Sequence, residues 1–200
     1  GMMAGFALAA VSGVSFGYWG PELFARSYGL GATEAKTGFA LSFGGAGLIG
    51  MLMFGALADR MARRGMDWPL RLSGMAIGAA TAAILFVTWS DSYAMARLAA
   101  IPSGLLGGGW SVGMLATLQY VLPHRFRASA TALFIAATTL AAQFAGPFAT
   151  GLASEWLGGD AQALRIALSV VIPLGFVGAL CSWWAAAHVE RDRADLLAWR

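Results

Sequence analysis

The sequence predicts an all-α transmembrane protein, a six-helix bundle built from two inverted three-helix repeats. The chain of 200 residues is 58% hydrophobic and only 12% charged, which is about half the charged share of a soluble domain. Its apolar residues form long runs, and short polar clusters separate these runs. The ends of the first two runs also resemble the ends of the fourth and fifth, which indicates a repeat.

Six apolar runs are long enough to cross a membrane, because a hydrocarbon core of about 30 Å needs roughly 20 residues of helix. None carries a polar face every 3.6 residues along its full length, as a soluble helix would. The expected spans are 2–26, 34–58, 71–90, 94–122, 127–153 and 164–187. The first run has no Lys or Arg before Arg26, unlike a signal peptide, whose apolar run follows a basic segment.

Two pairs of similar segments predict the repeat. They are "YWGP" (18–21) with "YVLP" (120–123), and "GALAD" (55–59) with "GLASE" (151–155). Three helices per unit reverse the second unit in the membrane, so the repeat is expected to be inverted. The expected units are 1–92 and 93–187, with a cytoplasmic tail over 188–200.

Glycines four residues apart let helices approach closely in lipid. Such pairs are Gly13/Gly17, Gly74/Gly78, Gly104/Gly108 and Gly109/Gly113. We therefore expect tight helix packing at these four places.

The basic residues predict the orientation, because cytoplasmic loops carry an excess of Lys and Arg. One side of the expected topology holds Arg60, Arg63, Arg64, Arg71, Arg125, Arg127, Arg191, Arg193 and Arg200. The other side holds Arg26, Lys36, Arg97 and Arg165. We therefore expect both termini in the cytoplasm. The expected location is a bacterial inner (plasma) membrane, which the protein crosses several times.

A cluster of charge lies between the second and third spans, in "GALADRMARRG" (55–65). The topology rule explains its arginines but not Asp59, four residues after Gly55. A carboxylate here can dock on the positive N-terminal end of a neighbouring helix, and arginines can pair with it. The predicted cytoplasmic gate consists of Gly55, Asp59, Arg60, Arg63 and Arg64. A purely topological role for these residues stays open.

Three segments resemble the major facilitator superfamily of transporters. "GALADRMARR" (55–64) resembles its signature loop, Gly-x-x-x-Asp-Arg/Lys-x-Gly-Arg/Lys-Arg/Lys, except that Ala62 stands where the family usually has glycine. "PHRFRASATALF" (123–134) resembles the loop between the tenth and eleventh helices. "YWGPELFARSYGLGATEA" (18–35) is similar to the seventh-helix exit of metabolite transporters, including Spinster-like members. The resemblance covers nearly the whole chain and implies the C-terminal six-helix half of a twelve-helix fold.

This resemblance implies secondary transport of a small organic solute by alternating access. The expected partners are the lipid bilayer, the solute, and either the missing N-terminal half-bundle or a second copy of the chain. The first helix of each repeat would line the cavity, where the candidates are Ser12, Ser15, Phe16, Trp19, Ser103, Trp110, Ser111 and Met114. Aromatic rings and hydroxyls suit an amphipathic or apolar solute, although each residue can instead pack against a helix or lipid.

Other function classes find little support. The histidines, His124 and His188, lie at membrane borders and far apart in the sequence, so neither a metal site nor a Ser-His-Asp triad is expected. The glycines of 104–110 lack the strand and the Lys-Ser/Thr of a nucleotide loop. We expect no enzyme activity, no cofactor, no metal and no nucleic-acid partner. Two alternatives stay open: a membrane subunit or scaffold without transport of its own, and a homodimeric six-helix transporter.

Overall fold

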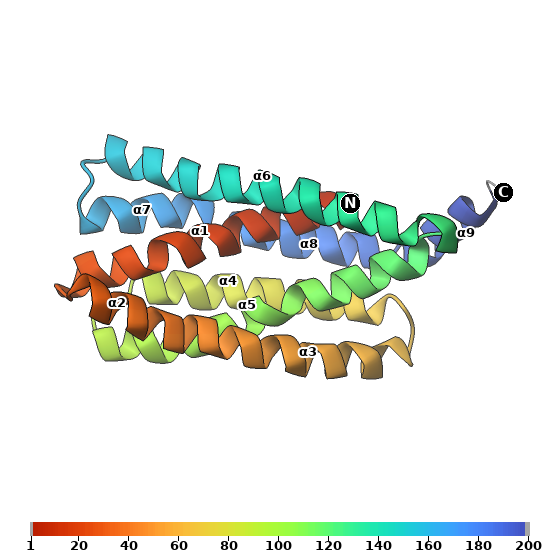
Figure 1. Ribbon diagram of the computed structural model, residues 1–200, viewed down its shortest axis with the longest axis horizontal. Helices are drawn as coiled ribbons and strands as arrows, with labels where there is room; N and C mark the ends of the chain where they lie inside the picture. Colours follow the sequence, from red (N-terminus) through yellow and green to blue (C-terminus); the bar gives the residue numbers. More distant parts are fainter. Residues whose placement is uncertain (1, 199–200) are drawn as a thin grey trace.

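The fold is an all-helical bundle whose long helices run roughly side by side (Figure 1). A computed structural model describes residues 2–198, and no strand occurs within this range. The helices in order are α1 (Met2–Tyr28), α2 (Ala32–Phe39), the π-helix η1 (Ala40–Gly45), α3 (Ala46–Ala62), α4 (Trp68–Thr88), α5 (Tyr93–Val121), the 3-10 turn η2 (His124–Phe126), α6 (Arg127–Trp156), α7 (Ala161–Val171), α8 (Leu174–Ala186) and α9 (Val189–Ala198). The predicted fold class is confirmed.

Six helical stretches are long and apolar enough to cross a membrane. They are Met2–Tyr28, Ala32–Ala62, Trp68–Thr88, Tyr93–Val121, His124–Trp156 and Ala161–Ala186. Each overlaps one of the six expected spans, which confirms that part of the prediction. The second span is not a uniform α-helix, because η1 interrupts it. The sixth is divided between α7 and α8 next to Pro173, whose ring prevents a regular helical hydrogen bond.

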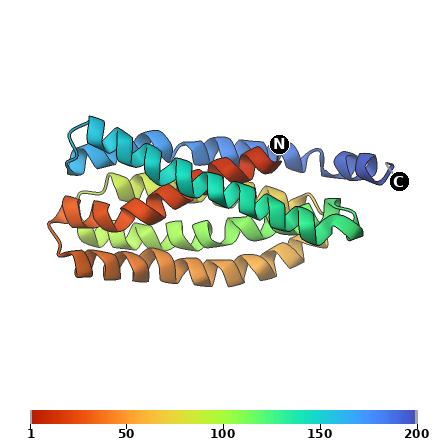
Figure 2. The same ribbon diagram turned by 45° about the horizontal axis from the view of Figure 1, so that its top comes forward.

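The spans alternate in direction, so the connections gather at two ends of the bundle (Figures 1 and 2). The α3–α4 and α5–α6 connections, the start of α1 and α9 lie toward one end, which we call the basic end. It carries the larger group of arginines expected on the cytoplasmic side. Arg200, the last of that group, lies outside the described residues. The α1–α2, α4–α5 and α6–α7 connections lie at the opposite end.

The helix contacts have an internal symmetry. The first span packs on the fifth and sixth, through α6 and α8, and the fourth span packs on the second and third, through α3 and α4. The third and sixth spans, α4 and α8, also pack on each other. Exchanging the first three spans with the last three leaves this set of contacts unchanged, as two similar three-helix units would require.

One of the two pairs of similar segments that predicted the repeat does not match in position. Pro21 lies inside α1, about two turns before its end, whereas Pro123 follows the end of α5. "YWGP" and "YVLP" therefore do not occupy equivalent positions. Asp59 and Glu155, by contrast, both lie in the last turn of their helices, α3 and α6.

Close packing occurs at most of the expected glycines, and α5 shows it best. A Cβ at Gly104 would collide with the backbone of Phe43, and one at Gly108 would collide with the backbone of Gly47. The second span thus lies directly on the fourth. The expectation is wrong for Gly13 and Gly17, where a Cβ would meet no atom within 4 Å.

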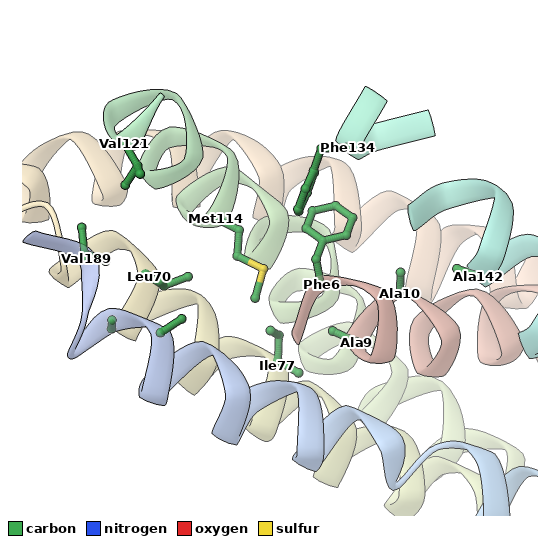
Figure 3. Close-up of a cluster of buried hydrophobic side chains, with 12 residues drawn as sticks. Phe6, Ala9, Ala10, Leu70, Ile77, Met114, Val121, Phe134, Ala142 and Val189 are labelled. Atoms are coloured by element: carbon green, nitrogen blue, oxygen red, sulfur yellow. The ribbon is translucent and has the colours of Figure 1, made fainter. Parts of the chain in front are cut away.

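Two buried apolar clusters stabilise the bundle, one toward each end. The cluster toward the basic end contains Phe6, Ile77, Met114 and Phe134, whose side chains converge from α1, α4, α5 and α6 (Figure 3). The rings of Phe6 and Phe134 meet edge to face at 4.9 Å. The cluster at the opposite end is rich in aromatic rings and includes Phe16, Phe24 and Phe39. The space between the two clusters is the middle of the bundle.

Candidate functional site

A cavity of about 340 Å³ lies at the middle of the bundle, between the two buried clusters. It is bounded by α1, η1, α4, α5 and α6, each near the middle of its membrane span. Most of its wall consists of Gly, Ala and aliphatic side chains. The polar and aromatic residues of the wall are Phe6, Ser12, Phe43, Thr81, Trp110, Ser111 and Thr139. No Asp, Glu, Lys, Arg or His is among the lining residues.

Two hydroxyls on this wall already donate hydrogen bonds to the protein. Ser12 Oγ donates to the carbonyl oxygen of Ile172 at 2.8 Å, and Thr81 Oγ1 donates to that of Ile77 at 2.8 Å. Both residues are buried. Toward a solute these two oxygens are therefore acceptors, because their protons are used within the protein.

The π-helix η1 places Phe43 on the cavity wall. The ring of Phe43 stacks on Phe39, with centroids 5.0 Å apart, and meets Phe16 edge to face at 5.2 Å. Gly104 of α5 allows this turn to approach α5, since any side chain there would strike the Phe43 backbone. Single π-turns within helices are frequent at functional sites. The sequence predicted a regular helix here and missed Phe43, and only the Gly44–Gly45 pair hinted at an irregular turn.

Three of the eight predicted cavity residues line this cavity: Ser12, Trp110 and Ser111. The other five lie elsewhere. Ser15 donates to the Val11 carbonyl, Phe16 is in the aromatic cluster, Trp19 Nε1 donates to the Pro147 carbonyl at 3.0 Å, Ser103 donates to the Ala100 carbonyl, and Met114 is in the cluster of Figure 3. None of these five is among the lining residues of the cavity. The bonds of Ser15 and Ser103 lie within their own helices, whereas that of Trp19 joins α1 to α6.

The predicted gate residues lie at the basic end, in and after the last turn of α3. Asp59, Arg60, Arg63 and Arg64 are all exposed. Among the described residues, ion pairs join Arg26 to Glu22 and Arg71 to Asp67, and none joins Asp59 to an arginine. The expected pairing within the cluster is therefore not found inside this bundle.

The surface of α3 next to the gate residues is open. A Cβ on Gly55, one turn before Asp59, would meet no atom within 4 Å. The helix α3 continues through Ala62, where the signature loop usually has glycine, and the chain reverses near Gly65, whose φ is 157°. The turn that the signature loop usually makes at a glycine thus occurs here at Gly65, three residues after Ala62.

Among the residues whose side chains the structure describes, no three His, Cys, Asp or Glu come together in a group that could hold a metal ion. The histidines lie near the basic end, and His188 Nδ1 contacts the carbonyl oxygen of Trp184 at 2.8 Å. The central cavity itself presents apolar, aromatic and hydroxyl groups.

No protein family model matches the chain. A curated relative, described as an MFS-type efflux pump of Mycolicibacterium smegmatis, is 30% identical over 195 residues. The alignment covers 96% of this chain and 45% of the relative, so the chain spans about half the length of the relative it matches.

Solved structures match the fold closely. One is a bacterial homologue of the human lysosomal transporter Spinster in an inward-facing, unoccupied conformation, with a TM-score of 0.86 and 16% identity over 96% of this chain and 48% of that one. The same homologue in an inward-facing, occupied conformation gives a TM-score of 0.83 and 15% identity over 96% of this chain and 49% of that one. At these identities the likeness concerns the fold.

Proposed function

The chain is related to an MFS-type efflux pump and has the fold of one half of a major-facilitator transporter, and on this premise we propose that it supplies one six-helix half of a secondary transporter. This transporter moves a small organic solute across the membrane by alternating access. The chain is the C-terminal half, with three-helix repeats over 1–92 and 93–187 and a tail over 188–200. The symmetric helix contacts support the two repeats.

The central cavity is the single observation that carries this proposal. It lies at mid-membrane depth, where transporters of this kind bind their substrates, and no charged side chain lines it. Ser12, Trp110 and Ser111 come from the first helix of each repeat, and Phe43 and Thr139 complete the polar and aromatic part of the wall. This lining suits an apolar or amphipathic solute. The name of the mycobacterial relative supports export as the direction.

Asp59, Arg60 and Arg63 form the cytoplasmic gate in this proposal. Their exposure and the open space beside Gly55 support it, because a helix of the other half can then approach α3 closely. The ion pairs made across this contact would hold the cytoplasmic side closed. In this arrangement both termini face the cytoplasm of a bacterium, and the protein resides in the inner membrane.

The proposal is tested by transport with the full-length native protein in proteoliposomes. The probe is N-phenyl-1-naphthylamine, a neutral aromatic dye whose fluorescence falls when it leaves the bilayer. Trp110→Ala removes a ring from the cavity wall and is expected to lower kcat/KM about tenfold. Trp184→Ala is the matched control, because Trp184 is 61% exposed on α8 and does not line the cavity. Equal transport by both variants and the wild type would reject the proposed cavity.

A further inference from the structure

The last two turns of α1 are set apart from the rest of the helix by Pro21. These turns lie at the end of the bundle opposite the basic end, which we call the outer end (Figure 1). Because proline has no N–H, Pro21 cannot donate to the carbonyl oxygen of Gly17, one turn earlier. We call residues 22–28 the outer segment of α1. With one helical hydrogen bond missing before it, the outer segment depends on its contacts with other elements for its position.

Arg165 of α7 holds the outer segment in place. Its Nε donates to Ser27 Oγ at 3.3 Å, and its Nη2 donates to the carbonyl oxygen of Ser90 at 3.1 Å. The Tyr28 hydroxyl donates to the same carbonyl oxygen at 2.8 Å. Ser90 is buried and belongs to the α4–α5 connection. One guanidinium group therefore joins α7, the end of α1 and the α4–α5 connection.

The place of Arg165 in the sequence is unusual, because it lies inside the sixth membrane span, in the second turn of α7. Charged side chains within membrane spans are rare, and those that occur pair with one another or with backbone carbonyls. Arg165 is half-buried and bonds a carbonyl in this way. The topology rule does not require a cation here, since this side of the protein has fewer basic residues. The contacts of Arg165 with α1 and Ser90 supply the reason.

A second hydrogen bond attaches the outer segment to the α6–α7 connection. Arg26 Nη1 donates to the carbonyl oxygen of Gly159 at 2.7 Å, and Arg26 Nε lies 2.7 Å from Glu22 Oε1. Arg26 is exposed, and exposed charged pairs contribute little because water competes for them. The half-buried bonds at Arg165 are therefore the main polar attachment of this segment.

The helix α7 lies behind α1 as seen from the central cavity. Residues of α1 line the cavity and no residue of α7 does, whereas α1 packs directly on α7. The bonds of Arg165 thus draw the outer segment away from the cavity. Without them the segment can lean toward the cavity, because α7 blocks movement in the other direction.

The helix α5, which also lines the cavity, has a similar attachment at the basic end. Arg193 of α9 donates from its Nη1 to the Tyr120 hydroxyl at 2.5 Å, and its guanidinium carbon lies 4.1 Å from the centroid of the Tyr120 ring. Tyr28 is the last residue of α1, and Tyr120 is the last but one of α5. Both cavity-lining helices therefore end in a tyrosine next to an arginine of another helix, at opposite sides of the membrane.

We propose that Arg165 is a positioning residue that keeps the outer path to the central cavity open. It fixes the end of α1 against α7 and the α4–α5 connection, so that the outer segment does not cover the cavity. This role rests on the proposed function, in which the cavity is reached from the two sides of the membrane in turn. Arg165 does not touch the solute, since it lies outside the cavity wall.

The labelling rate of a cysteine in the cavity tests this role in the full-length protein. The parent variant carries Ser111→Cys and Cys181→Ser, and an impermeant thiol reagent is added to right-side-out or inside-out membrane vesicles. Arg165→Met should lower the rate from the outer side about tenfold and Tyr28→Phe about threefold, because two hydrogen bonds and one are lost. The rate from the cytoplasmic side should not fall. Arg165→Lys keeps the charge and should retain part of the outer rate.

Ser169→Ala is the matched control. Ser169 lies on α7 one turn after Arg165, and its Oγ accepts a hydrogen bond from Trp89 Nε1 at 2.8 Å. This bond joins α7 to the end of α4 without involving α1, so the labelling rates should equal those of the parent variant. An equal change in Ser169→Ala and Arg165→Met, or faster labelling from both sides in Arg165→Met, would mean general loosening and would overturn the proposal.

Two further outcomes separate this proposal from the proposed function. A parent variant that is labelled from the cytoplasmic side only would reject alternating access, and the role of Arg165 with it. A parent variant that is labelled from both sides, at rates that Arg165→Met leaves unchanged, would reject the role of Arg165 alone. If Arg165→Met does not fold, as size-exclusion chromatography would reveal, Tyr28→Phe decides, because it keeps the ring and removes only the hydroxyl.

Discussion

The hydroxyl of Ser12 in α1 donates a hydrogen bond to the carbonyl oxygen of Ile172, 2.8 Å away, in the break between α7 and α8. Pro173 follows this carbonyl, and the N–H of Gly175 also donates to it at 2.9 Å. Proline interrupts the regular helical hydrogen bonds at such a break. A polar residue of the cavity wall therefore also fixes the irregular turn of the sixth span.

Replacement of Ser12 by alanine should lower stability. Ser12→Ala removes the donor to Ile172, and a hydrogen bond between membrane helices contributes about 0.6 kcal/mol on average. The melting temperature in detergent is therefore expected to fall slightly. Ser111→Ala serves as the control, because Ser111 lies on the same wall and is only half-buried. A fall as large in the control as in Ser12→Ala would argue against a specific role for the bond.

The contact between α3 and α5 predicts that alanine at Gly108 destabilises the protein much more than alanine at the adjacent Gly107. Gly108→Ala would place a methyl group against the backbone of Gly47, which cannot move aside as a side chain can. Overpacking of this kind costs about 1–3 kcal/mol. Gly107→Ala is the matched control, since its Cβ would meet only the Phe43 ring, 4.0 Å away. Thermal unfolding should show a clearly lower melting temperature for Gly108→Ala alone, and equal values would contradict the packing.

The gate predicts a shift between conformations when Asp59 is neutralised. Asp59→Asn should favour the inward-open state, because the carboxylate no longer pairs across the cytoplasmic contact. The measurement is the labelling rate of a cysteine introduced at Gln119, an exposed residue of α5 near the basic end. The rate should rise severalfold in Asp59→Asn.

Asp67→Asn provides the control for the gate. Asp67 is also acidic and lies in the same connection, but it pairs within the bundle, with its Oδ2 2.9 Å from Arg71 Nε. Its labelling rate should stay near that of the wild type. An unchanged rate in Asp59→Asn would leave the cluster with a topological role alone.

The distribution of arginines predicts which end faces the cytoplasm. In a Cys181→Ser background, a cysteine at the exposed Asp91 should react with a membrane-impermeant maleimide added to intact cells. A cysteine at the exposed Arg63 should react only after the membrane is permeabilised. The reverse pattern would invert the proposed orientation.

The spans were predictable because length and hydropathy alone determine them. Each expected range overlaps a helical stretch of the structure, and the comparisons confirm the resemblance to the major facilitator superfamily. The face that each helix turns toward the cavity was less predictable. When a helix is apolar on every face, periodicity does not distinguish the cavity wall from a buried contact. For this reason the sequence placed Phe16, Met114 and Trp110 alike on the cavity wall. In the structure Phe16 and Met114 are buried between helices, and only Trp110 lines the cavity.

Two other features depend on contacts that the sequence does not display. The π-turn that carries Phe43 depends on the approach of α5 at Gly104, more than 60 residues away. The contact of Arg193 with Tyr120 depends on α9, which packs on the end of α5. The sequence assigned Arg193 to topology, because local charge does not reveal which ring a distant arginine meets. The error at "YWGP" arose from matching four letters without the helix ends, which the structure places differently.

The most direct test of alternating access is the accessibility of a single cysteine on the wall of the central cavity. Ser111→Cys is introduced into the full-length protein with Cys181→Ser, and right-side-out and inside-out membrane vesicles are treated with an impermeant thiol reagent. The proposed mechanism predicts labelling from both sides, with Asp59→Asn raising the cytoplasmic rate and lowering the opposite one. Labelling from one side only, unaffected by Asp59→Asn, would contradict a transport pathway through this bundle.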